Sequence, residues 1–199
     1  MKKLIPLLLA FIFMGSIVVL PYGYLQRSVA ERLKTAQDLE QSGKSKEALD
    51  EYKKFAQYLG RFKWLKSHFD DEYSAAMVGQ LRLLYATGTF DKVIDLADTC
   101  IQEKISDTGA VYFWGGNALI QRGLTEPSFQ DAFPWLNRAM AQFQKGLEED
   151  THGRWNLKYN YELVATIIAE ATKGNEEKPQ QILRRKEEKI EKPHAKVAG

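Results

Sequence analysis

The side chains that most often carry catalysis or bind metals are few in this sequence and lie far apart. The histidines share no i, i+4 or short-loop spacing, and the H-E-x-x-H motif of zinc enzymes does not occur. The single cysteine, Cys100, cannot form an internal disulfide or a thiolate metal cage, and no serine stands at the spacing of a recognised nucleophile. We therefore predict no catalytic residue, no metal and no cofactor, and interpret His68, His152 and His194 as surface residues.

Two acidic clusters and a glycine pair are also interpreted as structural. Residues 70–72 and 148–150 are acidic, and each cluster precedes a predicted helix, where carboxylates favour the positive end of the helix dipole. Neither cluster has the D-x-D-x-D-G pattern of a calcium loop. Gly115 and Gly116 have no Lys-Ser/Thr after them and no strand before them, so we expect close helix packing there rather than phosphate binding.

A basic and aromatic segment between two predicted helices is the first candidate contact surface. The string RFKWLK occupies positions 61–66. A tryptophan exposed beside lysine and arginine suits lipid headgroups or a protein partner, and the alternative is an amphipathic helix extension that packs back on the body. The residues predicted to make the contact are Arg61, Lys63, Trp64 and Lys66.

The second candidate surface is the string DTHGRWNLKYNYEL at positions 150–163. Trp155, Tyr159 and Glu162 stand at i, i+4 and i+7, on one face of a helix, with Asn156 and Asn160 beside them. In a structural interpretation, Trp155 and Tyr159 seal the end of the core, and Asn156 or Asn160 bonds backbone groups of the preceding turn. In a functional interpretation, Trp155, Asn156, Tyr159 and Asn160 bind a partner.

The amino terminus is predicted to be a membrane anchor. Residues 4–25, LIPLLLAFIFMGSIVVLPYGYL, contain no charge and follow Lys2 and Lys3. At about 1.5 Å per residue these 22 residues span a hydrocarbon core of roughly 30 Å. Tyr22 and Tyr24 suit the aromatic belt of a membrane surface. The alternatives are a cleaved signal peptide, although no A-x-A cleavage pattern follows, and a buried core helix.

Charge predicts the orientation of this anchor and argues against one class of partner. A short basic tail usually stays in the cytoplasm while the rest of the chain is translocated, although Arg27, Arg32 and Lys34 also flank the span. In a bacterium this gives a single-pass protein of the inner (cytoplasmic) membrane, in contact with its lipid, with the body in the periplasm. Residues 26–172 carry 18 basic and 21 acidic side chains, and a net charge of −3 argues against binding nucleic acid.

Helical periodicity recurs throughout the body, and no stretch shows sustained apolar/polar alternation, so the predicted fold class is all-α. The predicted helices are 28–41, 45–59, 72–87, 90–105, 109–122, 133–147 and 153–173. We predict three parts: a transmembrane anchor at 1–25, a helical-repeat domain at 26–173, and a disordered charged tail at 174–199.

Three predicted turns share a glycine and give the body a repeat. In GKSKEAL (43–49) and GTFDKVI (88–94) the glycine stands five positions before a core residue, and a third turn is predicted at Gly123. The pattern resembles the tetratricopeptide repeat, a helix-turn-helix unit, and implies a solenoid of degenerate hairpins, because the consensus tryptophan and closing proline are missing from the first two units. The matching residues are Gly43, Ala48 and Tyr52, then Gly88, Phe90, Val93 and Ala97, then Gly116 and Gly123.

The string at 150–163, behind one anchor and degenerate repeats, is similar to MxaK-type accessory proteins, which are encoded with MoxR-type ATPases and von Willebrand factor A proteins. This resemblance implies an assembly or maturation factor for a periplasmic metalloenzyme such as methanol dehydrogenase. It implies as partners a von Willebrand factor A protein or a MoxR-linked complex.

The sequence as a whole predicts a membrane-anchored, extracytoplasmic helical-repeat adaptor that binds protein partners and is not an enzyme. Stacked hairpins present a concave face to a peptide or helix, and no motif in the chain offers catalysis. The alternatives are a generic tetratricopeptide scaffold in envelope assembly or secretion, and a hydrolase.

Overall fold

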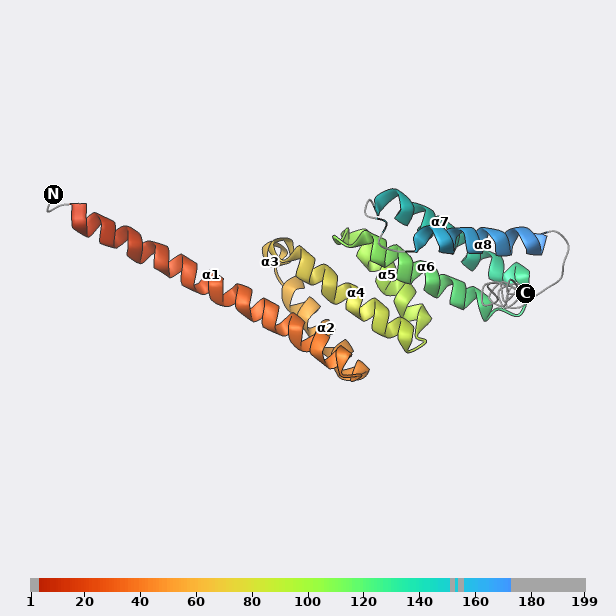
Figure 1. The fold of residues 1–199 in the computed structure, drawn as a ribbon, viewed down its shortest axis with the longest axis horizontal. Coiled ribbons are helices and arrows are strands. Elements are labelled where there is room, and N and C mark those ends of the chain that lie inside the picture. The colour runs from red at the N-terminus through yellow and green to blue at the C-terminus, as the bar shows by residue number, and fades with distance from the viewer. Residues whose placement is uncertain (1–3, 151–152, 154–155, 173–199) are drawn as a thin grey trace, which may run out of the picture. The chain divides into compact units, whose positions relative to one another are not determined.

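A computed structural model describes residues 4–150, 153 and 156–172, with side chains from Tyr22 onward. These residues form helices and no strand, so the all-α prediction is confirmed for them. The helices, shown in Figure 1, are α1 (Leu4–Gln41), α2 (Ser45–Gly60), α3 (Lys63–His68), α4 (Asp70–Ala86), α5 (Phe90–Glu103), α6 (Thr108–Leu124), α7 (Phe129–Glu149) and α8 (Leu157–Thr172).

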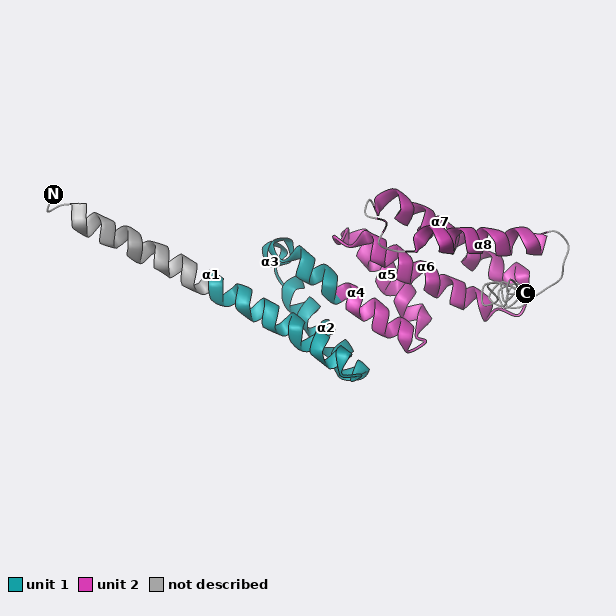
Figure 2. Cartoon of the chain, viewed as in Figure 1, with its two compact units in different colours: residues 1–76 teal, residues 77–199 magenta. Residues whose placement is uncertain are grey.

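The chain separates into two compact units, Met1–Ala76 and Met77–Gly199, and the boundary falls inside α4 (Figure 2). In the first unit α1 packs against α2, and α2 against α3. In the second unit α5 packs on α6, α6 on α7, and α8 on both α6 and α7. The structure has the helix–turn–helix order predicted at 28–59 and 72–105, and the predicted helix ends at Gln41 and near Ala86 lie where the structure has them.

The first two hairpin turns have the same backbone geometry. Gly43 has φ of +74° and Gly88 has φ of +71°, in the left-handed region that glycine adopts at little cost. The amide of Lys44 donates to the Leu39 carbonyl at 3.0 Å, and that of Thr89 donates to the Leu84 carbonyl at 3.0 Å. In each turn the glycine amide also donates to the carbonyl three residues earlier, at 2.9 Å. These two hydrogen bonds together form the Schellman motif, which closes the carboxyl end of a helix.

The core positions repeat with the same period. Each position lies 45 residues before its counterpart, as Gly43 does before Gly88. The buried pairs are Ala36 and Leu81, Ala48 and Val93, Tyr52 and Ala97, and Phe55 and Cys100. The turns and the buried positions of the two helix–turn–helix segments therefore match.

The third hairpin departs from the predicted pattern. Gly123 does not make the turn: it lies inside α6, is buried, and a Cβ there would stand 3.2 Å from the Cβ of Trp135. The turn comes after Leu124, and Ser128 caps α7, its hydroxyl accepting from the amide of Asp131 at 3.2 Å. The glycine at 123 serves close packing between α6 and α7, so its predicted role as a helix breaker is wrong.

Several predicted helix starts were wrong. The body helix expected from Ser28 is the end of α1, which runs from Leu4 through Pro21 and Gly23 without a break. α7 begins at Phe129 rather than 133, since the Ser128 cap outweighs Pro134 inside the helix. α8 begins at Leu157 rather than near Gly153, and the linker 60–69 holds a separate short helix, α3.

The predicted membrane anchor has no counterpart among the helices that the structure describes in full. Within the described residues, no helix combines the length and the apolar character that crossing a membrane requires. Side chains 4–21, which make up most of the predicted anchor, lie outside the description, as does the predicted tail at 174–199.

Candidate functional site

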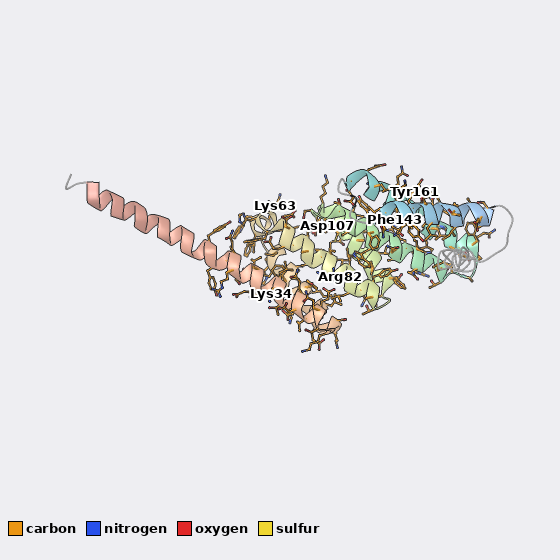
Figure 3. All side chains as sticks on the ribbon, in the orientation of Figure 1. Lys34, Lys63, Arg82, Asp107, Phe143 and Tyr161 are labelled. Atoms are coloured by element: carbon orange, nitrogen blue, oxygen red, sulfur yellow. The ribbon has the colours of Figure 1, made fainter. Side chains whose placement is uncertain are left out.

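The first candidate surface surrounds α3, and the structure places its residues on two sides of that helix. Leu65 is buried and holds α3 against its own unit, while Trp64 is 62% exposed. Phe62, which begins α3 as its N-cap, is 57% exposed and was not singled out from the sequence. Arg61 and Lys63 are exposed as well, and Lys63 is labelled in Figure 3. The segment therefore does pack back on the body, through Leu65, and turns its tryptophan outward.

Lys66 differs from the other predicted contact residues. Its ammonium nitrogen lies 4.5 Å from the centroid of the Tyr73 ring, and the side chain is half-buried. A cation over an aromatic face is attracted by the ring quadrupole. Lys66 therefore packs on α4 within its own unit and is less available to a partner than Arg61 or Lys63.

The carboxyl end of α3 is tied to α1 by a hydrogen bond. The hydroxyl of Tyr22 and Nε2 of His68 are 2.6 Å apart, and the two rings meet edge-on with centroids 5.4 Å apart. His68 is exposed, as predicted for a surface histidine, but it has this partner 46 residues earlier in the chain. The bond places α3 beside the point where the predicted anchor ends.

The second candidate surface, at the start of α8, is divided between core and solvent. Asn160 is buried, and its amide nitrogen donates to the Asn117 side-chain oxygen on α6 at 3.2 Å. Tyr159 is 50% exposed and Asn156 is exposed. The prediction that Tyr159 seals the core is therefore wrong, since Leu157 is the buried residue there. The predicted bond from Asn156 or Asn160 to backbone groups of the preceding turn concerns residues that mostly lie outside the described part of the chain, as does Trp155.

The two acidic clusters have different positions. Asp70–Glu72 occupies the first turn of α4, as predicted. Residues 148–150 instead end α7, at the negative end of its dipole, because α7 runs to Glu149 and α8 begins only at Leu157. Glu149 accepts a hydrogen bond from the Tyr112 hydroxyl at 3.2 Å. The pKa of Tyr112 is raised to about 12, mainly because the hydroxyl is buried and next because it lies beside the negative charge of Glu149.

The glycine pair does serve close helix packing, as predicted. A Cβ added at Gly115 would stand 2.7 Å from Oε1 of Gln142 and 2.9 Å from the Cβ of Ala97. A Cβ at Gly116 would overlap the ring of Phe143, which is labelled in Figure 3 and fully buried. The pair thus lets α6 approach α5 and α7 closely.

No constellation for catalysis emerges from the described side chains. Among them, no group of three or more His, Cys, Asp or Glu residues is placed to hold a metal ion. Cys100 is buried in α5, away from solvent. The arrangement offers two exposed surfaces, at α3 and at the start of α8.

No protein family model matches the chain, and neither curated proteins nor solved structures show a significant similarity to it.

Proposed function

We propose that this protein is a membrane-anchored, non-enzymatic helical-repeat adaptor that binds protein partners on the extracytoplasmic side of the inner membrane. The repeated hairpin carries the proposal. Two helix–turn–helix segments have the same turn and the same buried positions, and solenoids are built from such repeated segments. Solenoids use their extended faces to bind peptides and helices. The likeness to tetratricopeptide repeats belongs to this proposal.

Residues 4–25 would provide the anchor. They are free of charge and long enough to cross a bilayer, and Lys2 and Lys3 before them favour a cytoplasmic amino terminus. A reporter enzyme that is active only after export, fused behind Gly199, tests this orientation. Activity of the fusion supports a periplasmic body, and activity only of a cytoplasmic reporter at the same place contradicts it.

The likeness to MxaK-type accessory proteins sharpens the proposal to an assembly factor for a periplasmic metalloenzyme such as methanol dehydrogenase. The partner would then be a von Willebrand factor A protein or a MoxR-linked complex. The exposed side chains of Asn156 and Tyr159, within the string that carries the resemblance, are where we place the contact. The buried Asn160 holds this part of α8 against α6 through its hydrogen bond to Asn117.

Capture of the full-length protein from mildly solubilised envelopes tests the docking surface. We expect the wild type to retain a von Willebrand factor A protein or an ATPase-linked subunit, and Tyr159→Ala to lose most of it. Phe133→Ala is the matched control, because Phe133 is also a partly exposed aromatic residue but lies on α7. Equal recovery by the wild type and Tyr159→Ala would contradict the placement of the contact at α8.

A generic tetratricopeptide scaffold in envelope assembly or secretion is the second candidate. The repeated hairpins support it equally well, because they do not depend on the string at 150–163. Recovery of a secretion or envelope-assembly subunit in the same capture would favour it over the metalloenzyme assembly factor.

A further inference from the structure

The exposed apolar side chains of the first unit lie near the middle of α1 and at the start of α3. Of the seven large hydrophobic side chains that are exposed in the described part of the chain, four are Tyr22, Tyr24, Phe62 and Trp64. The first two stand on α1 where the uncharged segment ends, and the other two begin α3. The Tyr22–His68 bond of 2.6 Å ties the carboxyl end of α3 to α1 at this level.

The segment that leads into and includes α3 is basic, and three carboxylates follow it at the start of α4. Residues 53–69 contain five Lys or Arg side chains and no Asp or Glu, whereas residues 26–172 together have a net charge of −3. Arg61 and Lys63 are exposed and flank Phe62. Aromatic rings between basic side chains suit a lipid surface, because the rings enter the headgroup region while the cations meet phosphates.

The position along α1 puts this segment at headgroup level. A helical anchor that starts at Leu4 crosses a hydrocarbon core of roughly 30 Å in about 20 residues. Tyr22 then stands at the membrane surface. His68 is bonded to Tyr22, and α3 therefore lies at the same depth. Leu65 stays buried and keeps α3 on its unit while Phe62 and Trp64 project outward.

We infer that residues 61–64 are a lipid-binding foot that seats on anionic phospholipid headgroups beside the anchor. Phe62 and Trp64 enter the interfacial layer, and Arg61 and Lys63 contact lipid phosphates. Lys66 remains on the Tyr73 ring. The inference depends on the proposed anchoring of residues 4–25 and assigns to lipid a surface that would otherwise suit a protein partner.

Tryptophan quenching in reconstituted vesicles tests the foot. The full-length protein is placed in vesicles of phosphatidylcholine, alone or with phosphatidylglycerol, that contain lipids brominated near the headgroup end of the acyl chain. We expect the bromolipids to quench the wild type more than Trp64→Phe, so that the difference isolates Trp64 from the other three tryptophans. The Arg61→Gln/Lys63→Gln variant should lose part of this quenching in phosphatidylglycerol vesicles and keep it in phosphatidylcholine alone.

The matched control is Lys44→Gln/Lys46→Gln, which removes the same charge at the far end of the α1–α2 hairpin, about 30 Å along the helix from Tyr22. It should leave the quenching unchanged. Circular dichroism checks that each variant keeps the helix content of the wild type.

Two outcomes overturn the inference in distinguishable ways. If alkaline washing removes the wild type from the vesicles, the anchor itself fails. If the protein stays in the membrane but Trp64→Phe is quenched as much as the wild type, Trp64 does not contact lipid and only the foot fails. If the Lys44→Gln/Lys46→Gln control loses as much quenching as the Arg61→Gln/Lys63→Gln variant, the effect is one of overall charge. That result would also contradict the inference.

Discussion

At the scale of single residues, the contact between α5, α6 and α7 depends on the missing side chain of Gly115. We predict that Gly115→Ala destabilises the protein. The new methyl group would meet Oε1 of Gln142, which can swing aside, and the Cβ of Ala97, which cannot. Overpacking of a close contact costs about 1–3 kcal/mol, and alanine regains at most about 1 kcal/mol from its better helix propensity.

Urea unfolding followed by circular dichroism measures this loss. Gly60→Ala is the control, since its nearest neighbour, a Tyr73 ring carbon, would be 3.9 Å from the added Cβ. An unchanged midpoint for Gly115→Ala would contradict the close approach of α5 and α6.

Tyr112 gives a prediction on pH. Its pKa in the folded protein is raised to about 12, above the ordinary value near 10. The unfolded chain therefore loses this proton first as pH rises, so the stabilisation is complete below pH 10 and is lost between pH 10 and 12. The loss should be about 1–2 kcal/mol.

Tyr112→Phe removes the titrating group, so the stability difference between the wild type and this variant should narrow from pH 10 to 12. Chemical unfolding of both proteins across that range measures the effect. Parallel curves would mean that the hydroxyl of Tyr112 is not held beside Glu149 as the 3.2 Å bond indicates.

The same scale shows which residues could be predicted from the sequence. The role of the glycine pair followed from local pattern, because two small residues in an apolar helix permit close packing wherever the partner comes from. The bonds Tyr22–His68 and Asn117–Asn160 could not be predicted, because their partners lie 46 and 43 residues apart. Tyr159 appeared to be a core residue, but the late start of α8 leaves Leu157 to fill the core and Tyr159 half exposed.

At the scale of elements, the turns of the first two hairpins both require a positive φ at their glycine. A Cβ at Gly43 or Gly88 would meet no atom within 4 Å, so the only cost of alanine there is the positive φ. We predict that Gly43→Ala and Gly88→Ala each lower the free energy of unfolding by about 1–2 kcal/mol. Asparagine, which tolerates this conformation better, should lose less at each position.

Thermal unfolding of the four variants measures these losses. Similar costs for alanine at both turns would support one repeated unit. No loss at either position, or a greater loss with asparagine than with alanine, would contradict the shared turn geometry.

Local signals at helix ends explain the accuracy and the errors at this scale. Gly43 and Gly88 are followed by a spacing that fixes both the turn and the next buried residue, so these hairpins could be predicted. Gly123 is also a glycine near a predicted turn, but it packs against α7 and lies inside α6. The acidic residues 148–150 resembled a helix start, and only the length of α7 shows that they are its end.

At the scale of the whole molecule, charge and exposure divide the chain by function. The body has a net negative charge, whereas the segment 53–69 carries only basic charges and two of the exposed aromatic residues. The exposed part of the α8 string lies in the second compact unit, and α3 lies in the first. We therefore assign lipid contact to the first unit and partner contact to the second.

The fold class could be predicted at this scale because helical periodicity is a local property of the chain. The division into two units within α4 could not, since α4 continues through the boundary as one helix.

Photocrosslinking from the α8 surface in intact membranes tests the central claim most directly. A photoreactive amino acid replaces Tyr159, and a matched probe replaces Ala169, which is also exposed but about 15 Å further along α8. The adaptor account predicts one defined protein adduct from position 159 and none from position 169. No adduct from position 159, or the same adducts from both positions, would contradict it.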